Sequence, residues 1–204
     1  MKRVAVFASG RGSNLGALVA AQAVFSSYRV VLVVSNVESS GALAQARSAG
    51  IETLCSPSKG LSREEHERSL LKELEGRAVD LICLAGYMRI LGPALTGEFS
   101  GSILNIHPSM LPAFPGMHAQ RQAIEAGVRW SGATVHFVDS GVDTGPIIFQ
   151  EPVKVDPADT EATLSERILA VEHLLYPRAV DVVARDAYTV RHRTVVLLDP
   201  QHAT

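Results

Sequence analysis

The order of apolar and polar positions predicts alternating strands and helices in the first half of the chain. Short apolar runs, each long enough for one strand, alternate with segments of helical period. Such alternation is typical of βαβ units, which build a parallel sheet. We predict strands over residues 4–8, 30–35, 51–55, 80–85 and 102–106. Helices are predicted to begin near 13, to span 41–49, to run from an N-cap at Ser62 to about 74, and to turn briefly over 93–99.

The second half has a different pattern, with two strands joined by a polar loop and one long helix. Strands are predicted over 133–138 and 146–150, joined by a loop rich in glycine and aspartate, with an extension over 153–155. Asp159 and Thr160 open the helix, which Pro177 can kink or restart. A small hairpin over 188–190 and 194–197 closes the chain. We therefore predict a single α/β domain over 1–204: a doubly wound, mostly parallel sheet with a Rossmann-like N-terminal half and a mixed C-terminal part.

Composition and charge narrow the range of partners. The 204 residues are 47% hydrophobic and 20% charged, and the formal net charge is −2. This balance gives no reason to expect binding to nucleic acid or to an anionic membrane. No apolar run has membrane-spanning length, and Met1 leads directly into a strand instead of a signal peptide. We expect a cytoplasmic protein in which Cys55 and Cys83 are structural thiols.

A glycine-rich turn follows the first strand. Gly12, Ser13 and Asn14 open the first helix, where free N–H groups and close backbone approach suit a phosphate. The alternative is a tight turn with Ser13 or Asn14 as the N-cap. The turn lacks the Gly-Lys-Ser/Thr ending of a nucleoside triphosphate loop, and its glycine spacing differs from the dinucleotide pattern. A small phosphorylated substrate therefore fits better than NAD.

The strand over 102–106 carries the clearest catalytic chemistry. Asn105 and His107 lie two positions apart, so they point to the same side of the strand. An amide N–H can stabilise an oxyanion, and an imidazole can move a proton near neutral pH. Asp143, on the glycine-rich loop between two later strands, could pair with the imidazolium and raise its pKa. A structural histidine and an Asx-turn aspartate are the alternatives.

Six motifs together resemble those of the glycinamide ribonucleotide formyltransferase family, the folate-dependent enzymes of purine synthesis. The resemblance runs from Val4 to about Pro177, and residues 178–204 match poorly. The matching segments are Ser9–Asn14, Leu84–Leu91, Leu104–Ser109, His136–Val138, Asp143–Pro146 and Glu172–Pro177.

The resemblance implies a formyltransferase fold and a formyl transfer from 10-formyltetrahydrofolate to the amine of glycinamide ribonucleotide. It implies that Asn105 and protonated His107 stabilise the tetrahedral intermediate, with Asp143 raising the histidine pKa. By the same resemblance, the loop of Gly12, Ser13 and Asn14 binds the substrate phosphate, and Glu172 reaches the glycinamide end. A helical glutamate is more often solvated, which is the alternative for Glu172.

Folate contacts are also implied by the resemblance. They fall on an arginine, on the Met-Arg-Ile-Leu segment, on Asn105 and on the aspartate loop. The implied residues are Arg63, Met88, Arg89, Ile90, Leu91, Asn105, Asp139, Ser140, Gly141, Val142 and Asp143. Arg63 could instead be an ordinary surface arginine in the first turn of its helix.

We expect no metal, because the histidines and carboxylates are assigned to other work and no zinc-ligand spacing occurs. The expected partners are the two small substrates, and a homodimer is possible. The nearest rivals are a formyltetrahydrofolate hydrolase and a methionyl-tRNA formyltransferase, which normally carry an extra N-terminal and C-terminal domain, respectively. A non-catalytic nucleotide-sensing module is a third rival, but it would have no use for Asn105, His107 and Asp143 together.

Overall fold

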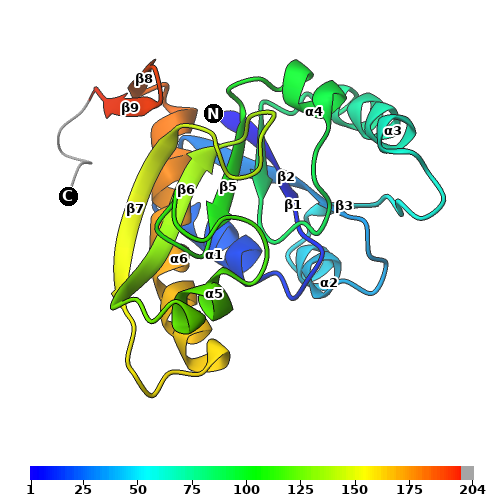
Figure 1. The fold of residues 1–204 in the computed structure, drawn as a ribbon. Helices are drawn as coiled ribbons and strands as arrows, with labels where there is room; N and C mark the ends of the chain where they lie inside the picture. The colour runs from blue at the N-terminus through cyan, green and yellow to red at the C-terminus, as the bar shows by residue number, and fades with distance from the viewer. Residues whose placement is uncertain (199–204) are drawn as a thin grey trace. The chain divides into compact units, whose positions relative to one another are not determined.

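Four parallel strands organise the first 104 residues in the computed structural model, which describes residues 1–198 (Figure 1). Their order is β3-β2-β1-β4, so the chain starts in the middle and winds outward in both directions. Apolar side chains fill these strands, and residues 4–8 are fully buried. The strands are β1 (Lys2–Phe7), β2 (Tyr28–Ser35), β3 (Glu52–Cys55) and β4 (Leu81–Leu84).

Helices connect the parallel strands, as the right-handed crossover of this fold class requires. Ser40 and Ser62 cap α2 and α3 with their side chains, and Ser62 forms a reciprocal capping box with Glu65. The predicted cap at Ser62 is therefore confirmed. The helices are α1 (Ser13–Ala21), α2 (Gly41–Ser48), α3 (Arg63–Glu75) and α4 (Pro93–Glu98).

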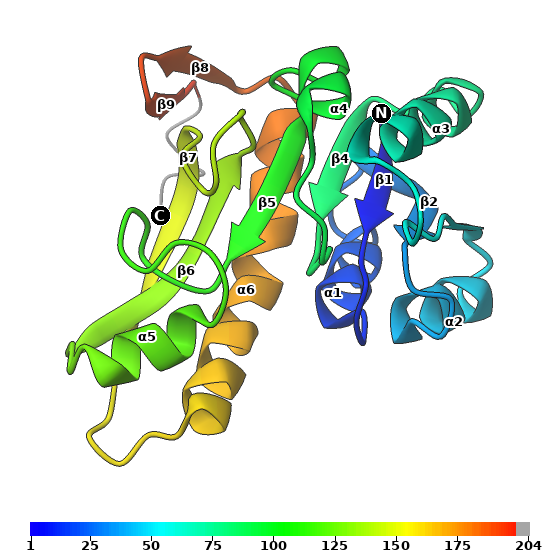
Figure 2. The ribbon, with the colours of Figure 1, turned by 45° about the vertical axis from the view of Figure 1, so that its right-hand side comes forward.

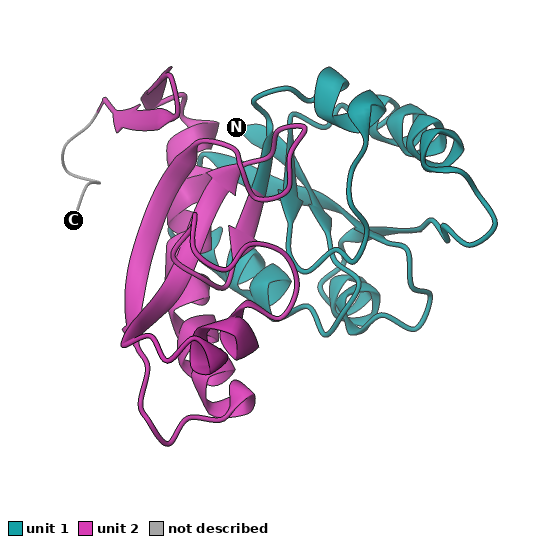
Figure 3. Cartoon of the chain, in the orientation of Figure 1, with its two compact units in different colours: residues 1–104 teal, residues 105–204 magenta. Residues whose placement is uncertain are grey.

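The chain from Asn105 onward forms a second compact unit with a mixed sheet (Figure 3). Its strand order is β5-β6-β7-β9-β8, in which β6 and β7 are antiparallel and β7 and β9 are parallel. The long helix α6 lies along β6 and β7 (Figure 2). The elements are β5 (Ile103–His107), α5 (Ala119–Glu125), β6 (Trp130–Phe137), β7 (Ile147–Lys154), α6 (Glu161–Ala184), β8 (Tyr188–Arg191) and β9 (Thr194–Leu197).

Three details differ from the sequence predictions. The helix α5 was not predicted, because it has only seven residues and its N-cap, His118, is left-handed and makes no side-chain cap. The two pieces predicted for β7 form one strand through Pro152, which pairs with Gly132 on one side. The helix α6 continues through Pro177 without a restart.

The predicted fold class is confirmed, since a parallel α/β first half is followed by a mixed second half. The predicted closing hairpin is also present as β8 and β9. That residues 1–204 form a single domain stays a prediction, and residues 199–204 of that range lie outside the described residues.

Candidate functional site

The glycine-rich turn after β1 leaves the start of α1 without a side-chain cap. Gly12 is the N-cap at φ +86°, and a β-carbon there would lie 2.8 Å from the Ala42 Cα atom. Only glycine fits this conformation and this close approach. Neither Ser13 nor Asn14 is the N-cap, so that alternative is wrong. The first turn of α1 carries no acidic residue, which leaves its N–H groups suited to an anion.

The Met-Arg-Ile-Leu segment follows β4 as an exposed loop. The Ser9 hydroxyl accepts a hydrogen bond from the Met88 N–H (2.9 Å) and donates one to the Asn36 side chain (2.5 Å). Met88 and Ile90 expose 66% and 59% of their surface, although both are apolar. Such exposure, on a loop whose backbone is held, is suited to a flat apolar ligand.

Arg63 lies next to this segment. It is the first residue of α3, and its Cδ atom would be 2.6 Å from a β-carbon on Gly92, which directly follows Leu91. The residue itself is exposed. The Arg89 guanidinium donates a hydrogen bond to the Ser58 carbonyl (3.2 Å). The structure therefore brings Arg63 and the Met88–Leu91 segment together, as a shared folate contact would require.

A polar cluster lies at the end of β5 in the second unit. His107 Nδ1 is 3.4 Å from Asp143 Oδ2, and His136 Nε2 is 3.6 Å from Asp143 Oδ1. Asn105 Nδ2 lies 3.1 Å from His136 Nε2 and 3.5 Å from Asp143 Oδ1. The three residues predicted to be catalytic are therefore in contact, and His136 joins them.

The hydrogen bonds identify which atom of the Asn105 amide lies between these neighbours. Asp143 Oδ1, which can only accept, lies 3.5 Å from Asn105 Nδ2. An amide next to a carboxylate presents its NH₂ group to it. Asn105 therefore points donors, the groups that an oxyanion needs, into the cluster.

Opposing effects act on the pKa of His107. The residue is 4% exposed, and this burial lowers the pKa of His107 below its usual 6.5. The Phe114 carbonyl, 2.8 Å from Nε2, and the charge of Asp143 both oppose this shift but do not overcome it. Asp143 acts on this pKa in the predicted direction, but desolvation is the larger effect. That His107 is protonated when the intermediate forms stays a prediction.

Asp143 remains ionised despite its own burial. Burial alone would raise the pKa of this carboxyl, but His136, the Gly116 N–H at 2.7 Å and the nearby His107 together lower it. Its backbone has φ +54°, a conformation that aspartate and asparagine tolerate better than most residues. The Asx-turn interpretation therefore does not account for Asp143, whose carboxylate faces the two histidines.

The remaining predicted residues lie on the aspartate loop and on α6. Asp139, Ser140, Gly141 and Val142 are exposed, and Asp139 accepts hydrogen bonds from the Gly141 N–H and the Thr144 hydroxyl. Glu172 is 7% exposed. The alternative of a solvated helix glutamate is therefore wrong for Glu172.

Sequence analysis missed three members of these arrangements. His136 was seen only as part of a polar segment, although the period of two in β6 places it on one side with Thr134. Ser9 and the Phe114 carbonyl could not have been identified, because their contacts depend on loops that no short pattern predicts.

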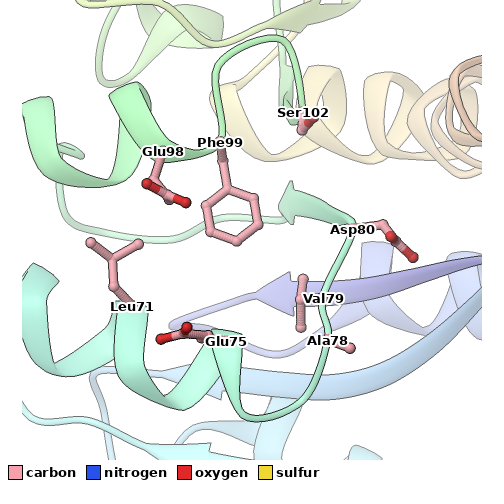
Figure 4. Close-up of a pocket in the computed structure, with 8 residues that line it drawn as sticks. All are labelled: Leu71, Glu75, Ala78, Val79, Asp80, Glu98, Phe99 and Ser102. Carbon is pink, nitrogen blue, oxygen red and sulfur yellow. The ribbon is translucent and has the colours of Figure 1, made fainter.

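A hollow of about 720 Å³ lies in the first unit, where α3 ends and β4 begins (Figure 4). It contains none of the predicted site residues. Among the described residues, no three histidine, cysteine or carboxylate side chains are grouped to hold a metal. No described helix is both long and apolar enough to cross a membrane. The residues that line the hollow are Leu71, Glu75, Ala78, Val79, Asp80, Glu98, Phe99 and Ser102.

Comparison with known proteins relates the chain to formyltransferases. The family described as "Formyl transferase" matches residues 2–180. The phosphoribosylglycinamide formyltransferase of Escherichia coli (strain K12) is 40% identical over 200 residues, which are 97% of this chain and 94% of that protein. A crystal structure of glycinamide ribonucleotide transformylase 1 from Symbiobacterium toebii has a TM-score of 0.94 and 44% identity, and the match covers 98% of this chain and 95% of that one.

Longer proteins contain a similar part. The trifunctional purine biosynthetic protein adenosine-3 of Drosophila melanogaster is 49% identical over 185 residues, which are 88% of this chain. The chain spans only 14% of the length of that relative. The likeness therefore concerns one part of the trifunctional protein.

Proposed function

The chain belongs to the phosphoribosylglycinamide formyltransferase family, and we propose that it transfers the formyl group of 10-formyltetrahydrofolate to the amine of glycinamide ribonucleotide in purine synthesis. The observation that carries this proposal is the contact of Asn105, His107 and Asp143 in one cluster. An amide donor, a titratable ring and a buried carboxylate are the groups that acyl transfer through an oxyanion needs.

The amine attacks the formyl carbon and forms a tetrahedral oxyanion. The Asn105 NH₂ group donates to that oxyanion. His107 takes up the proton that the attacking amine loses, and Asp143 stabilises the resulting imidazolium. When the oxyanion collapses, the bond between the formyl carbon and the folate nitrogen breaks, and His107 gives its proton to that nitrogen. The Phe114 carbonyl, which now faces Nε2, must give way for this step.

The other predicted residues bind the two substrates. The uncapped start of α1 at Gly12, Ser13 and Asn14 holds the ribonucleotide phosphate, and Glu172 reaches the glycinamide end. Folate lies against Arg63, the Met88–Leu91 segment and the Asp139–Asp143 loop. The support is the exposed apolar side chains of Met88, Ile90 and Val142, of which Val142 is 50% exposed.

The test is a formyl-transfer assay with both substrates, in which water is the competing acceptor. We expect formyl glycinamide ribonucleotide to form at the rate at which 10-formyltetrahydrofolate is consumed. Folate consumption without formylated ribonucleotide would instead identify a hydrolase and overturn the proposal. A chelator is expected to leave the rate unchanged. A homodimer, to be checked by sedimentation, and a cytoplasmic location stay predictions.

A further inference from the structure

One buried carboxylate in the first unit lies outside the machinery described above. Glu67, on α3, is 2% exposed. Its two carboxyl oxygens accept hydrogen bonds from two backbone N–H groups that lie 25 and 28 residues later in the chain. Oε1 accepts a very short hydrogen bond from the Gly92 N–H, and Oε2 accepts one of 3.4 Å from the Leu95 N–H. Two backbone donors thus satisfy a carboxyl group that is buried away from water.

These donors belong to the start of α4, which has no cap of its own. Its N-cap is Gly92, which has no side chain, and Pro93 follows at the first helical position. The helices α2, α3 and α6 each have a serine or threonine N-cap instead. Glu67 therefore supplies from α3 the acceptors that the first turn of α4 lacks.

The same contact fixes one end of the Met88–Leu91 segment. The Met88 N–H is bound by Ser9 at one end, and the Gly92 N–H is bound by Glu67 at the other. Between these points the side chains of Met88 and Ile90 remain exposed. The segment is thus held at its backbone while its apolar side chains face outward.

Close packing adds to the constraint at Gly92. A β-carbon there would lie 2.9 and 3.0 Å from the Glu67 oxygens and 2.6 Å from Arg63 Cδ. Arg63 and Glu67 are one helical turn apart on α3, so the same face of α3 contacts this glycine with both side chains. A shift of Glu67 would therefore move the end of the segment relative to Arg63.

We propose that Glu67 is a positioning residue for folate, which sets the Met88–Leu91 segment against Arg63 by capping α4 from a distance. This inference rests on the proposed function of that segment. It adds a residue that does not touch folate itself. Its loss should weaken folate binding and leave the ribonucleotide and the chemical step largely unaffected.

The test is Glu67→Gln in the full chain. Glutamine has nearly the same size but only one acceptor oxygen, so its NH₂ group must face one of the two backbone donors. We expect the KM for 10-formyltetrahydrofolate to rise about tenfold, as one lost hydrogen bond to a charged group would give. The KM for glycinamide ribonucleotide and kcat should change less than about twofold, which a general loss of structure would not produce.

Glu73→Gln is the matched control, because it makes the same change on the same helix. Glu73 lies near the far end of α3, where it pairs with Arg77 instead of the start of α4. We expect wild-type KM values for both substrates. Circular dichroism should show that both variants are folded.

A second variant, Ile90→Ala, tests separately whether the Met88–Leu91 segment binds folate. Calorimetry with tetrahydrofolate should show weaker binding for both Ile90→Ala and Glu67→Gln. Weaker binding only for Ile90→Ala would overturn the role of Glu67 and leave the folate segment in place. Unchanged binding for Ile90→Ala would remove the segment from the folate site, and the inference with it. Neither result bears on formyl transfer by the wild-type protein, which is measured separately.

Discussion

Replacing Asp143 by asparagine removes one negative charge from the polar cluster and changes little else. Asparagine has nearly the same shape and tolerates the φ of +54° at this position. Its side-chain oxygen can still accept from the Gly116 N–H, which lies 2.7 Å from Asp143 Oδ2. Asp143→Asn is therefore a test of charge, and we expect the variant to remain folded.

The size of the effect follows from the distance between the charges. Asp143 Oδ2 lies 3.4 Å from His107 Nδ1, and the aspartate side chain is 11% exposed. With an effective dielectric constant of about 20, the attraction between the two charges is worth about 5 kcal/mol before their desolvation is counted. The pKa of His107, which burial already lowers, should fall further in the variant. Because the imidazolium that forms with the intermediate loses this stabilisation, turnover should fall about 10²- to 10⁴-fold.

Two measurements check this reasoning. Titration of the His107 ring by NMR should show the lower pKa, and steady-state kinetics should show the loss in kcat. Asp139→Asn is the control for the titration, because Asp139 bonds to Gly141 and Thr144 instead of a histidine. Wild-type turnover in a folded Asp143→Asn protein would refute the mechanism. A loss of turnover with an unchanged His107 pKa would refute the electrostatic role.

Three further predictions concern the loop, the core and pH. Ser13→Asp should raise the KM for glycinamide ribonucleotide at least about tenfold, because the new carboxylate repels the substrate phosphate. The melting temperature should hold or rise, because an acidic side chain suits the start of α1. An unchanged KM would show that the loop is purely structural. Tyr87→Phe should raise the free energy of unfolding, measured by urea denaturation, by about 1 kcal/mol, because the buried hydroxyl has no hydrogen-bond partner among the described residues. A lower free energy of unfolding would show that the hydroxyl does have a partner. Burial lowers the pKa of His107 and His173, so the unfolded chain binds more protons than the folded one below about pH 6.5. The free energy of unfolding should therefore fall as the pH drops below that value. A free energy of unfolding that stays constant between pH 7 and 5 would contradict both shifts.

The sequence could predict what depends on local pattern. The parallel strands, the Ser62 cap and the shared side of Asn105 and His107 follow from periods of two and 3.6 and from cap chemistry. The resemblance to the family, the fold class and the class of enzyme are confirmed by the comparisons. The roles of the individual site residues stay predictions.

What the sequence could not predict depends on burial and on contacts between distant loops. The net pKa of His107 is such a case, because a carboxylate can be identified in the sequence but the degree of desolvation cannot. Glu67 is another. The helical period places it on the buried face of α3 with His66, Leu70 and Leu74, but its charge argues for a solvated position. Only the uncapped start of α4 explains why a carboxylate is buried there.

The contacts of His107 explain how a buried neutral ring can serve a reaction that passes through an anion. Each ring nitrogen faces an acceptor, Asp143 at Nδ1 and the Phe114 carbonyl at Nε2. A neutral imidazole has one N–H and can satisfy only one of them, whereas an imidazolium satisfies both. Burial opposes that protonation, because it lowers the pKa of the ring. In the proposed mechanism, the oxyanion that forms beside the ring favours the imidazolium. The ring would then hold the proton at the step where the proton stabilises the transition state more than the ground state.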